Sequence, residues 1–431
     1  MLCESEIELD SRLRLCSVDV LREKEVFKMS TPMDEVHPPT RLLLTPGPSC
    51  VSPRVYRALA SPIVGHVDPW FTEFMGGVQD LLRRVFQTTN HVTLPISASG
   101  SGGIETAVVN VLEPGDEAII CVNGVFSERM AEIGERTGAK IHRVSAPYGR
   151  VVDPEDVRRA GQGRKIKFVG LAQGETSTGV LSSIAPFRKV ADELGALLIA
   201  DSVATLAGVP VEVDRQHIDL CFSGSQKAIS APPGMSPITL NARIEELLRN
   251  RKTKVQSWYF DLTTVMKYWG KERTYHHTPP IPLIYGLHEA LRIVLEEGLE
   301  ASWERHRQNQ TALIAGLEAM GLGLFVQNPA DRLTTVTAVN IPSGIDGTKV
   351  RSRLLNDFNI EISGGYGELR TKIWRVGLMG YSSQRANVLL FLGAFEKVLL
   401  DLGMKLPAGA GLTAAANSYA NAEPVPVGQE K

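Results

Sequence analysis

The chain is poor in cysteine, in aromatic residues and in net charge, and each shortage excludes a class of protein. Its 431 residues include 5 cysteines and 6% aromatic residues, and 46 Lys+Arg against 48 Asp+Glu leave a net charge of -2. The cysteines are widely spaced and form no Cys-x-x-Cys pair, which argues against a disulfide framework or a zinc site. Balanced, scattered charge gives no electrostatic basis for binding nucleic acid or an anionic membrane surface.

Long apolar runs are also missing. No run approaches the roughly 20 apolar residues that a membrane-spanning helix needs. Glu4, Glu6 and Glu8 precede any apolar stretch, which argues against a signal peptide. We therefore expect a cytoplasmic protein that binds neither membranes nor nucleic acid. Its 43% hydrophobic content is enough for one large core or two.

Strand-like and helix-like runs alternate through the first two thirds of the chain. The expected strands are 92–96, 117–122, 140–144, 167–171, 197–200, 220–223 and 236–240. Helix-like stretches lie between several of them, at 103–112, 127–137, 153–160 and 187–194. Alternation with short glycine-bearing turns predicts an α/β fold with a mostly parallel sheet of seven strands and helices on both faces.

The pattern changes after a helix-rich stretch that ends near residue 317. Strand, helix, strand and long helix follow, which predicts a second, smaller α+β domain. We expect a large domain at 39–300 and a small domain at 301–405. Residues 1–38 are charged and read as an irregular arm, and residues 406–431 are rich in Ala, Gly, Pro and Asn and read as a disordered tail.

Lys227 and Asp201 carry the most specific chemical signal. Asp201 closes an apolar strand, and Lys227 lies in a Gly/Ser turn just past another strand end. Ligands in such sheets bind beyond the carboxyl ends of the strands. A lysine that forms a Schiff base, with a carboxylate that keeps a pyridine nitrogen protonated, is what a pyridoxal phosphate (PLP) enzyme needs. The two residues alone are equally compatible with a salt-bridged strand end and a solvated lysine.

Three further features also follow strand ends. The run Ser-Ala-Ser-Gly-Ser-Gly-Gly at 97–103 opens a helix, where free N–H groups and the helix dipole can bind a phosphate. Phe126 could stack on a flat ring, and the Thr176 hydroxyl could bond a ring oxygen. Each feature alone is compatible with a flexible turn, a core aromatic or a polar turn. Their order together with Asp201 and Lys227 favours the PLP hypothesis.

Several short motifs spread over residues 42–402 carry a family resemblance. They are LLLTPGPS (42–49), SASGSGGIE (97–105), NVLEPGD (110–116), GETSTGV (174–180), DSVA (201–204), SGSQK (223–227), YHHT (275–278) and RVG (375–377). In these motifs the chain resembles the class V branch of the fold-type I PLP enzymes. It is most similar there to the alanine–glyoxylate (serine–pyruvate) aminotransferases.

The resemblance implies specific contacts with the cofactor. Lys227 would be the Schiff-base lysine and proton shuttle, and Asp201 would pair with the pyridine nitrogen. Val203 and Phe126 would pack on opposite faces of the ring, and Thr176 would reach the ring hydroxyl. The phosphate would be held by Ser99, Gly100, Ser101 and Gln226.

The resemblance also implies how substrate and a second subunit would bind. Arg375 would take the substrate carboxylate through its planar fork, and Gly47 and Gly65 would line the substrate pocket. Tyr275 and Thr278 would reach the phosphate of the neighbouring subunit, so the expected enzyme is a homodimer with shared sites. We find no convincing second arginine for a distal carboxylate, which favours small neutral amino acids and 2-oxo acids as substrates.

The expected activity is transfer of an amino group from alanine or serine to glyoxylate or pyruvate, with the alanine–glyoxylate reaction favoured. Serine–glyoxylate and 2-aminoethylphosphonate–pyruvate transamination stay open, as does, more remotely, a PLP-binding regulator without turnover. Phe126 and Ser101 depart from the tryptophan and histidine of the animal enzymes, which suggests a different specificity.

Two rival chemistries are weaker. A cysteine desulfurase needs a nucleophilic cysteine after the lysine, whereas the last cysteine, Cys221, precedes Lys227. The adjacent pair His276 and His277 has no suitably spaced third ligand, so we expect no metal site.

Overall fold

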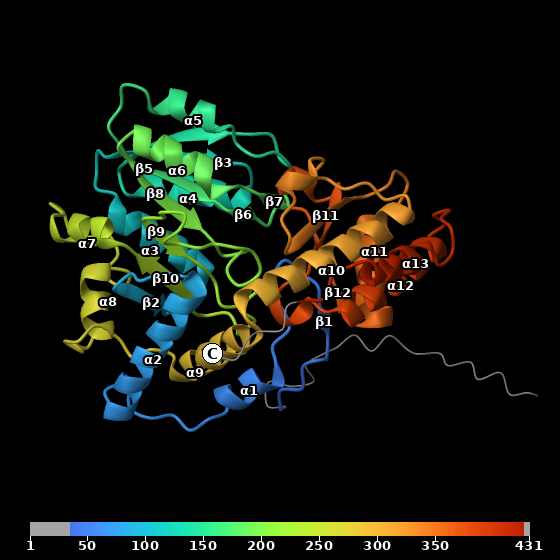
Figure 1. The fold of residues 1–431 in the computed structure, drawn as a ribbon, viewed down its shortest axis with the longest axis horizontal. Coiled ribbons are helices and arrows are strands. Elements are labelled where there is room, and N and C mark those ends of the chain that lie inside the picture. The colour runs from blue at the N-terminus through green and yellow to red at the C-terminus, as the bar shows by residue number, and fades with distance from the viewer. Residues whose placement is uncertain (1–34, 426–431) are drawn as a thin grey trace, which may run out of the picture. The chain divides into compact units, whose positions relative to one another are not determined.

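The computed structural model describes residues 35–425, and its largest sheet contains seven strands (Figure 1). They are β2 (Val92–Ile96), β3 (Glu117–Val122), β4 (Lys140–Ser145), β5 (Ile166–Ala172), β8 (Leu197–Asp201), β9 (Leu220–Phe222) and β10 (Ser236–Leu240). The strand order is β2-β10-β9-β8-β5-β3-β4, and only β10 runs antiparallel to its neighbours. The predicted mostly parallel sheet of seven strands is confirmed.

Most strands of this sheet are apolar, which suits a sheet covered on both faces. Every residue of β2, β8, β9 and β10 is buried, as expected for strands that are packed on two sides. The edge strand β4 differs, since Val144 is its one buried residue.

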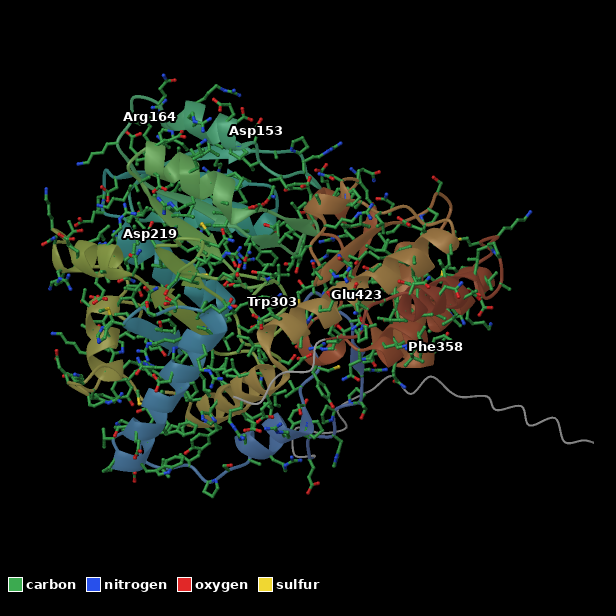
Figure 2. The ribbon with its side chains drawn as sticks, viewed as in Figure 1. Asp153, Arg164, Asp219, Trp303, Phe358 and Glu423 are labelled. Atoms are coloured by element: carbon green, nitrogen blue, oxygen red, sulfur yellow. The ribbon has the colours of Figure 1, made fainter. Side chains whose placement is uncertain are left out.

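Four helices connect the strands: α3 (Gly100–Val111), α4 (Val125–Arg136), α5 (Pro154–Gly161) and α6 (Ile184–Glu193). Right-handed crossovers in this strand order place α3 and α4 on one face and α5 and α6 on the other. The contacts agree, because α3 packs on α4 and α5 packs on α6. Asp153 begins α5 by accepting the Glu155 N–H, with Pro154 in the first turn (Figure 2).

Helices that precede β2 or follow β10 in the sequence complete the larger hydrophobic core, which extends from Val55 to Leu299. They are α1 (Pro53–Leu59), α2 (Pro69–Phe86), α7 (Ala242–Arg249), α8 (Leu262–Trp269) and α9 (Ile281–Glu297). Helices α1 and α2 both pack on α9. Gly298 ends α9 and immediately precedes α10 (Leu299–Ala319).

A second hydrophobic core joins Leu44 to residues between Ala312 and Ala415. Its strands form two small sheets: β11 (Val336–Asn340), β14 (Ile373–Gly377) and β13 (Ser363–Gly364) are antiparallel, and β1 (Leu42–Leu43) pairs in parallel with β12 (Ile360–Glu361). Helices α11 (Gly347–Phe358) and α12 (Arg385–Asp401) pack on each other, near α10 (Figure 1). Short elements complete the list: the hairpin β6 (Gly174–Glu175) and β7 (Val180–Leu181), and the 3-10 turns Pro329–Asp331, Gly367–Leu369 and Gly380–Ser382.

The prediction of a disordered tail from residue 406 is wrong for residues 410–420. This segment forms α13 (Ala410–Ala420), which packs on α10 and α12. Small residues allow the close approach, because a side chain at Gly316 would lie 2.9 Å from the Gly411 carbonyl oxygen. The Tyr419 hydroxyl donates to the Asn309 side chain at 2.7 Å. Residues 426–431, and residues 1–34 of the predicted arm, lie outside the described part of the chain.

Within residues 35–425, no helix combines the length and the apolar character that crossing a membrane requires.

Candidate active site

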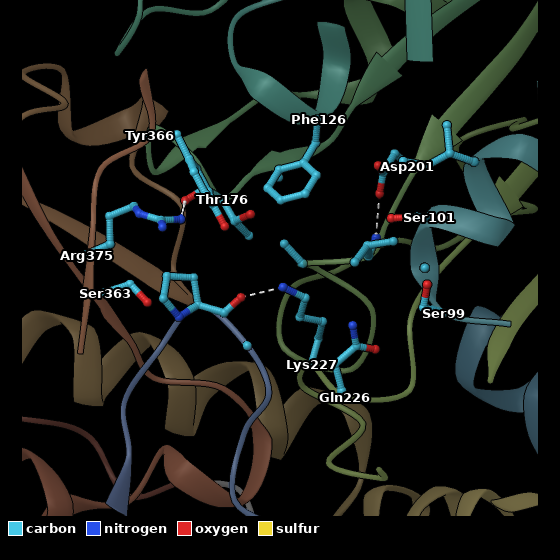
Figure 3. A pocket seen from close by; sticks show the side chains of 17 residues that line it. Ser99, Ser101, Phe126, Thr176, Asp201, Gln226, Lys227, Ser363, Tyr366 and Arg375 are labelled. Carbon is cyan, nitrogen blue, oxygen red and sulfur yellow. Dashed lines mark hydrogen bonds between the residues drawn. The ribbon is translucent and has the colours of Figure 1, made fainter. Parts of the chain in front are cut away.

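A cavity of about 190 Å³ lies between the carboxyl ends of the large-sheet strands and the segment from β13 to β14 (Figure 3). It brings together most of the predicted site residues: Gly47, Ser99, Gly100, Ser101, Phe126, Thr176, Asp201, Val203, Gln226, Lys227 and Arg375. In Figure 3 the residues from the large sheet and the residues Ser363, Tyr366 and Arg375 face each other across the Lys227 amine.

Lys227 extends into this cavity from the turn after β9. The segment that follows this turn holds it in place. The Ser225 N–H donates to the Met235 carbonyl, and the Ser225 hydroxyl donates to the Pro232 carbonyl. The Lys227 amine donates to the carbonyl oxygen of Pro46. Burial lowers the lysine pKa to about 8, although the nearby Asp201 carboxylate opposes the change. A larger fraction of Lys227 is therefore the neutral, nucleophilic amine than is usual for lysine.

Gly47 makes room for this lysine. Its φ of 86° lies in the left-handed region that favours glycine. A Cβ at this position would lie 2.5 Å from the Lys227 Nζ, which is closer than any ordinary contact. The residue was expected to line the substrate pocket; it lines the cavity, and its direct neighbour there is the lysine side chain.

Asp201 is the last residue of β8 and is 3% exposed. One of its carboxylate oxygens accepts the Val203 N–H at 2.8 Å, and no other residue between 35 and 425 donates to the carboxylate. Burial raises its pKa to about 7, with the Glu175 charge adding to the rise and the Val203 N–H and Lys227 opposing it. A buried carboxylate on a cavity wall with so few donors fits a ligand that presents an N–H.

The turn from β2 into α3 has the form of an anion cradle. Ser99 precedes α3, its side chain makes no capping hydrogen bond, and the first N–H groups of the helix remain available. A Cβ on Gly100 would lie 3.2 Å from a methyl group of Val203, so the cradle closely approaches the segment after Asp201. The Ser101 hydroxyl accepts from the Arg129 guanidinium at 2.8 Å, which adds positive charge beside the cradle.

Arg375, on β14, is 4% exposed and is held by the backbone on two sides. Its Nε donates to the Gly364 carbonyl at 2.8 Å and its Nη1 donates to the Thr176 carbonyl at 2.9 Å (Figure 3). The guanidinium lies 4.4 Å from the centre of the Tyr366 ring, a cation–π contact. Burial lowers the pKa of Arg375, and Tyr366 opposes that change. The remaining N–H groups of the fork can bind a carboxylate.

Three of the predicted residues lie outside the cavity of their own chain. Gly65, Tyr275 and Thr278 are exposed and do not line it, and Tyr275 is 57% exposed. Tyr275 and Thr278 lie next to each other, with their hydroxyl oxygens 3.4 Å apart.

Sequence reasoning missed Tyr366, Ser363 and Glu175. Tyr366 and Ser363 line the cavity, and the Tyr366 ring packs edge-on against Phe126 with their centres 6.2 Å apart. For Tyr366 and Ser363 the signal was a glycine-rich run carrying an aromatic residue, which begins in β13 and ends several residues before β14. Glu175 lies behind the cavity wall and belongs to the same motif as Thr176.

These residues fit PLP by their chemistry. The cradle suits a phosphate, Asp201 lacks the N–H donor that a pyridine nitrogen would supply, and Lys227 presents an amine to the same cavity. Val203 and Phe126 both line the cavity and offer apolar surface to a flat ring.

Comparison with known proteins agrees with this chemistry. The family model described as "Aminotransferase class-V" matches residues 56–384. The (S)-ureidoglycine–glyoxylate transaminase of Bacillus subtilis is 41% identical over 406 residues, which cover 90% of this chain and 97% of that protein. The alanine–glyoxylate aminotransferase of Rattus norvegicus is 42% identical over 352 residues, covering 81% and 85%.

A solved structure supports the same conclusion. The alanine–glyoxylate aminotransferase of Nostoc sp. superimposes with a TM-score of 0.84 at 43% identity, covering 86% of this chain and 98% of that one. Family, fold and cavity therefore agree, and the chain belongs to the class V aminotransferases, the PLP-dependent transaminases of fold type I.

Proposed function

We propose that the protein transfers the amino group of alanine or serine to glyoxylate, with alanine as the preferred donor. The observation that carries the choice of a donor without a second carboxylate is the single arginine of the cavity. Among the described residues that line it, Arg375 is the one arginine, and Lys227 is the one other cation. A donor with a second carboxylate would have to bury that charge without a partner, which is costly.

The chemistry divides between cofactor and protein. When bound, PLP supplies an electron sink that stabilises negative charge at the α-carbon of the amino acid. Asp201, a buried carboxylate, would hold positive charge at the ring nitrogen through a charge-assisted hydrogen bond. Arg375 binds the α-carboxylate of donor and acceptor alike, since both substrates carry that group.

Lys227 moves the proton. Its free amine would take the α-proton of the bound donor and later release that proton to complete the transfer. The backbone carbonyl of Pro46, which accepts from this amine, keeps it within the cavity. The lowered pKa, about 8, suits a group that must both accept and release a proton near neutral pH.

(S)-Ureidoglycine is the second candidate donor. The Bacillus subtilis relative named for that substrate matches 97% of its own length, and the alanine–glyoxylate relatives are similar at nearly the same identity. Both groups of relatives carry glyoxylate in their names, which supports glyoxylate as the acceptor here.

A donor panel with purified holoenzyme separates these candidates. Alanine, serine, (S)-ureidoglycine, 2-aminoethylphosphonate and aspartate would each be paired with glyoxylate, and all except alanine also with pyruvate, and the carbonyl product of the donor quantified. We expect the highest kcat/KM for alanine with glyoxylate. A higher value for ureidoglycine would transfer the assignment to that donor, and turnover of none would support a PLP-binding regulator.

We further propose that the active sites are shared between two subunits. Exposed Tyr275 and Thr278 would reach the phosphate of the partner, and exposed aromatic residues nearby, Trp258 and Tyr259, suit a buried interface.

Mixing two inactive variants tests the shared site. One subunit would carry Lys227→Ala, and the other Tyr275→Phe with Thr278→Ala. If the contacts act across the interface, each mixed dimer has one complete site and recovers activity and PLP retention after dialysis. Absence of recovery in confirmed mixed dimers would place these contacts within one subunit.

A further inference from the structure

Glu175 is a fully buried carboxylate with a complete set of donors. It is 0% exposed and lies at the end of β6, next to Thr176. One oxygen accepts the N–H groups of Phe126 at 3.1 Å and Ser127 at 3.0 Å. The other accepts the N–H of Ser177 at 3.0 Å and its hydroxyl at 2.6 Å. N–H groups can only donate, so both oxygens act as acceptors.

These contacts tie the start of α4 to the turn that carries Thr176. The first N–H groups of a helix have no partner within the helix. In α4 those of Phe126 and Ser127 go to Glu175, and that of Val125 goes to the Ser177 hydroxyl at 2.9 Å. An ordinary cap comes from the residue just before the helix, which is Gly124 here. This cap comes from a carboxylate 49 positions away from Phe126 in the sequence.

Gly124 shows how closely the two segments fit. Its φ of 179° is ordinary extended backbone, so conformation does not require glycine there. Space does: a Cβ at this position would collide with the Glu175 side chain and the Ser177 hydroxyl. The glycine therefore admits the carboxylate to the helix terminus.

Both segments joined in this way contact the cavity. Phe126, in the first turn of α4, and Thr176, beside Glu175, both line it. The Thr176 carbonyl also holds the Arg375 guanidinium at 2.9 Å. The Glu175 side chain thus fixes the Phe126 ring relative to the turn that contains Thr176. That turn carries the Thr176 hydroxyl and also anchors Arg375.

We propose that Glu175 is a positioning residue that sets the orientation of the PLP ring by holding Phe126 and Thr176 in a fixed relation. The inference depends on PLP as the cofactor of this family and not on the choice of amino donor, so failure of the donor assignment leaves it intact.

The test compares Glu175→Gln with Glu128→Gln. Each variant removes one carboxylate near the start of α4, but Glu128 pairs with the Arg143 guanidinium at 2.8 Å, away from the cavity. The readouts are the visible circular dichroism of bound PLP, which depends on ring orientation, the Kd of PLP for the apoenzyme, and the apoenzyme Tm.

For Glu175→Gln we expect loss of most of the visible circular dichroism and a PLP Kd about tenfold higher, the scale of one lost hydrogen bond to a charged group. Glu128→Gln should keep both at wild-type values. A Glu175→Gln protein with wild-type dichroism and Kd, altered only in Tm, would overturn the proposal and leave Glu175 a structural cap.

Gly124→Ala separates position from charge. It displaces the carboxylate without removing it, so we expect the same loss of dichroism. If Glu175→Gln changed the signal and Gly124→Ala did not, the charge of Glu175 and not its placement would matter, and the proposal would be wrong. If Glu175→Gln failed to fold, Ser177→Ala should give the same change in smaller measure, and wild-type dichroism and Kd in that variant would overturn the proposal.

Discussion

The two walls of the cavity are built in different ways. On one wall, Asp201 ends a strand of the large buried sheet, and Ser99 and Lys227 lie in the turns after two other strands. On the other, Arg375 belongs to a small antiparallel sheet, and Tyr366 lies in the glycine-rich segment before it. The first wall, here called the cofactor wall, carries groups that suit the cofactor. The second, the substrate wall, carries the group that suits the substrate.

The difference lies in what holds each side chain. A strand of the large sheet fixes the backbone of Asp201, and among residues 35–425 the carboxylate has a single donor, so it is free to serve a ligand. Arg375 is restrained along its side chain by two backbone carbonyls and by an aromatic ring. A rigid sheet lets the cofactor wall keep an unsatisfied group in place, whereas the substrate wall must restrain its long side chain directly.

Lys227→Ala breaks the cofactor wall and should have the largest effect. We expect kcat to fall at least about 10⁴-fold, because both the covalent attachment and the proton carrier are lost. The visible absorbance of the lysine-bound cofactor should disappear as well. Lys189→Ala, on exposed α6 surface, is the control and should leave both unchanged. An unaltered visible spectrum in Lys227→Ala would contradict the assignment of the lysine.

Arg375→Ala breaks the substrate wall alone. We expect KM for both the amino and the 2-oxo acid to rise about 10- to 100-fold, the scale of a lost bidentate ion pair, while the Kd of PLP stays within a few-fold of wild type. Arg375→Lys should recover only part of the loss, since ammonium cannot reproduce the planar fork. Wild-type KM values for either substrate in Arg375→Ala would exclude the residue as the carboxylate clamp.

The pH dependence of PLP uptake tests whether burial lowers the pKa of Lys227 on the cofactor wall. The neutral Lys227 amine attacks PLP, and the protonated amine does not, so the rate should rise with pH and level off above the lysine pKa of about 8. Below that value the rate should fall about tenfold per pH unit. Asp201→Asn removes an influence that raises this pKa, and the midpoint should shift to lower pH. Stopped-flow absorbance of apoenzyme mixed with PLP measures both, and a midpoint near the ordinary lysine pKa would refute the burial effect.

Tyr366→Leu should have the smallest effect and tests how much the ring contributes to the substrate wall. Loss of the cation–π contact is worth about 0.5–2 kcal/mol, so we expect KM to rise several-fold with kcat little changed. Tyr366→Phe keeps the ring and should stay close to wild type. Equal KM increases in both variants would point to the hydroxyl instead of the ring face.

The sequence predicted the cofactor wall more fully than the substrate wall. Lys227, Asp201 and the 97–103 run could be placed because each follows a readable apolar strand, and carboxyl ends of parallel strands meet at one edge. Arg375 was reached through the family resemblance. Tyr366 and Glu175 were missed, because their importance arises from contacts between segments far apart in the chain, for example the 49 positions between Glu175 and Phe126.

The error at α13 has a related cause. Its Ala/Gly-rich sequence shows no strong apolar stripe, and composition alone suggested disorder. The helix buries only Gly411 and Ala415, and these small residues let it approach α10 closely, as Gly411 meets Gly316. Close packing of this kind depends on the partner surface, which a local pattern does not contain.

The position of α13 near the end of the chain determines the order in which the large sheet and the second core can be completed during synthesis. The last strand of the large sheet ends at Leu240, whereas α13 begins at Ala410 and supplies Ala415 to the second core. At roughly 5–20 residues per second, α13 leaves the ribosome on the order of ten to thirty seconds after that sheet is complete. During this interval the nascent chain has the strands of its cofactor wall but not the finished core behind its substrate wall, so we expect Asp201 and Lys227 to reach their places before Arg375 does.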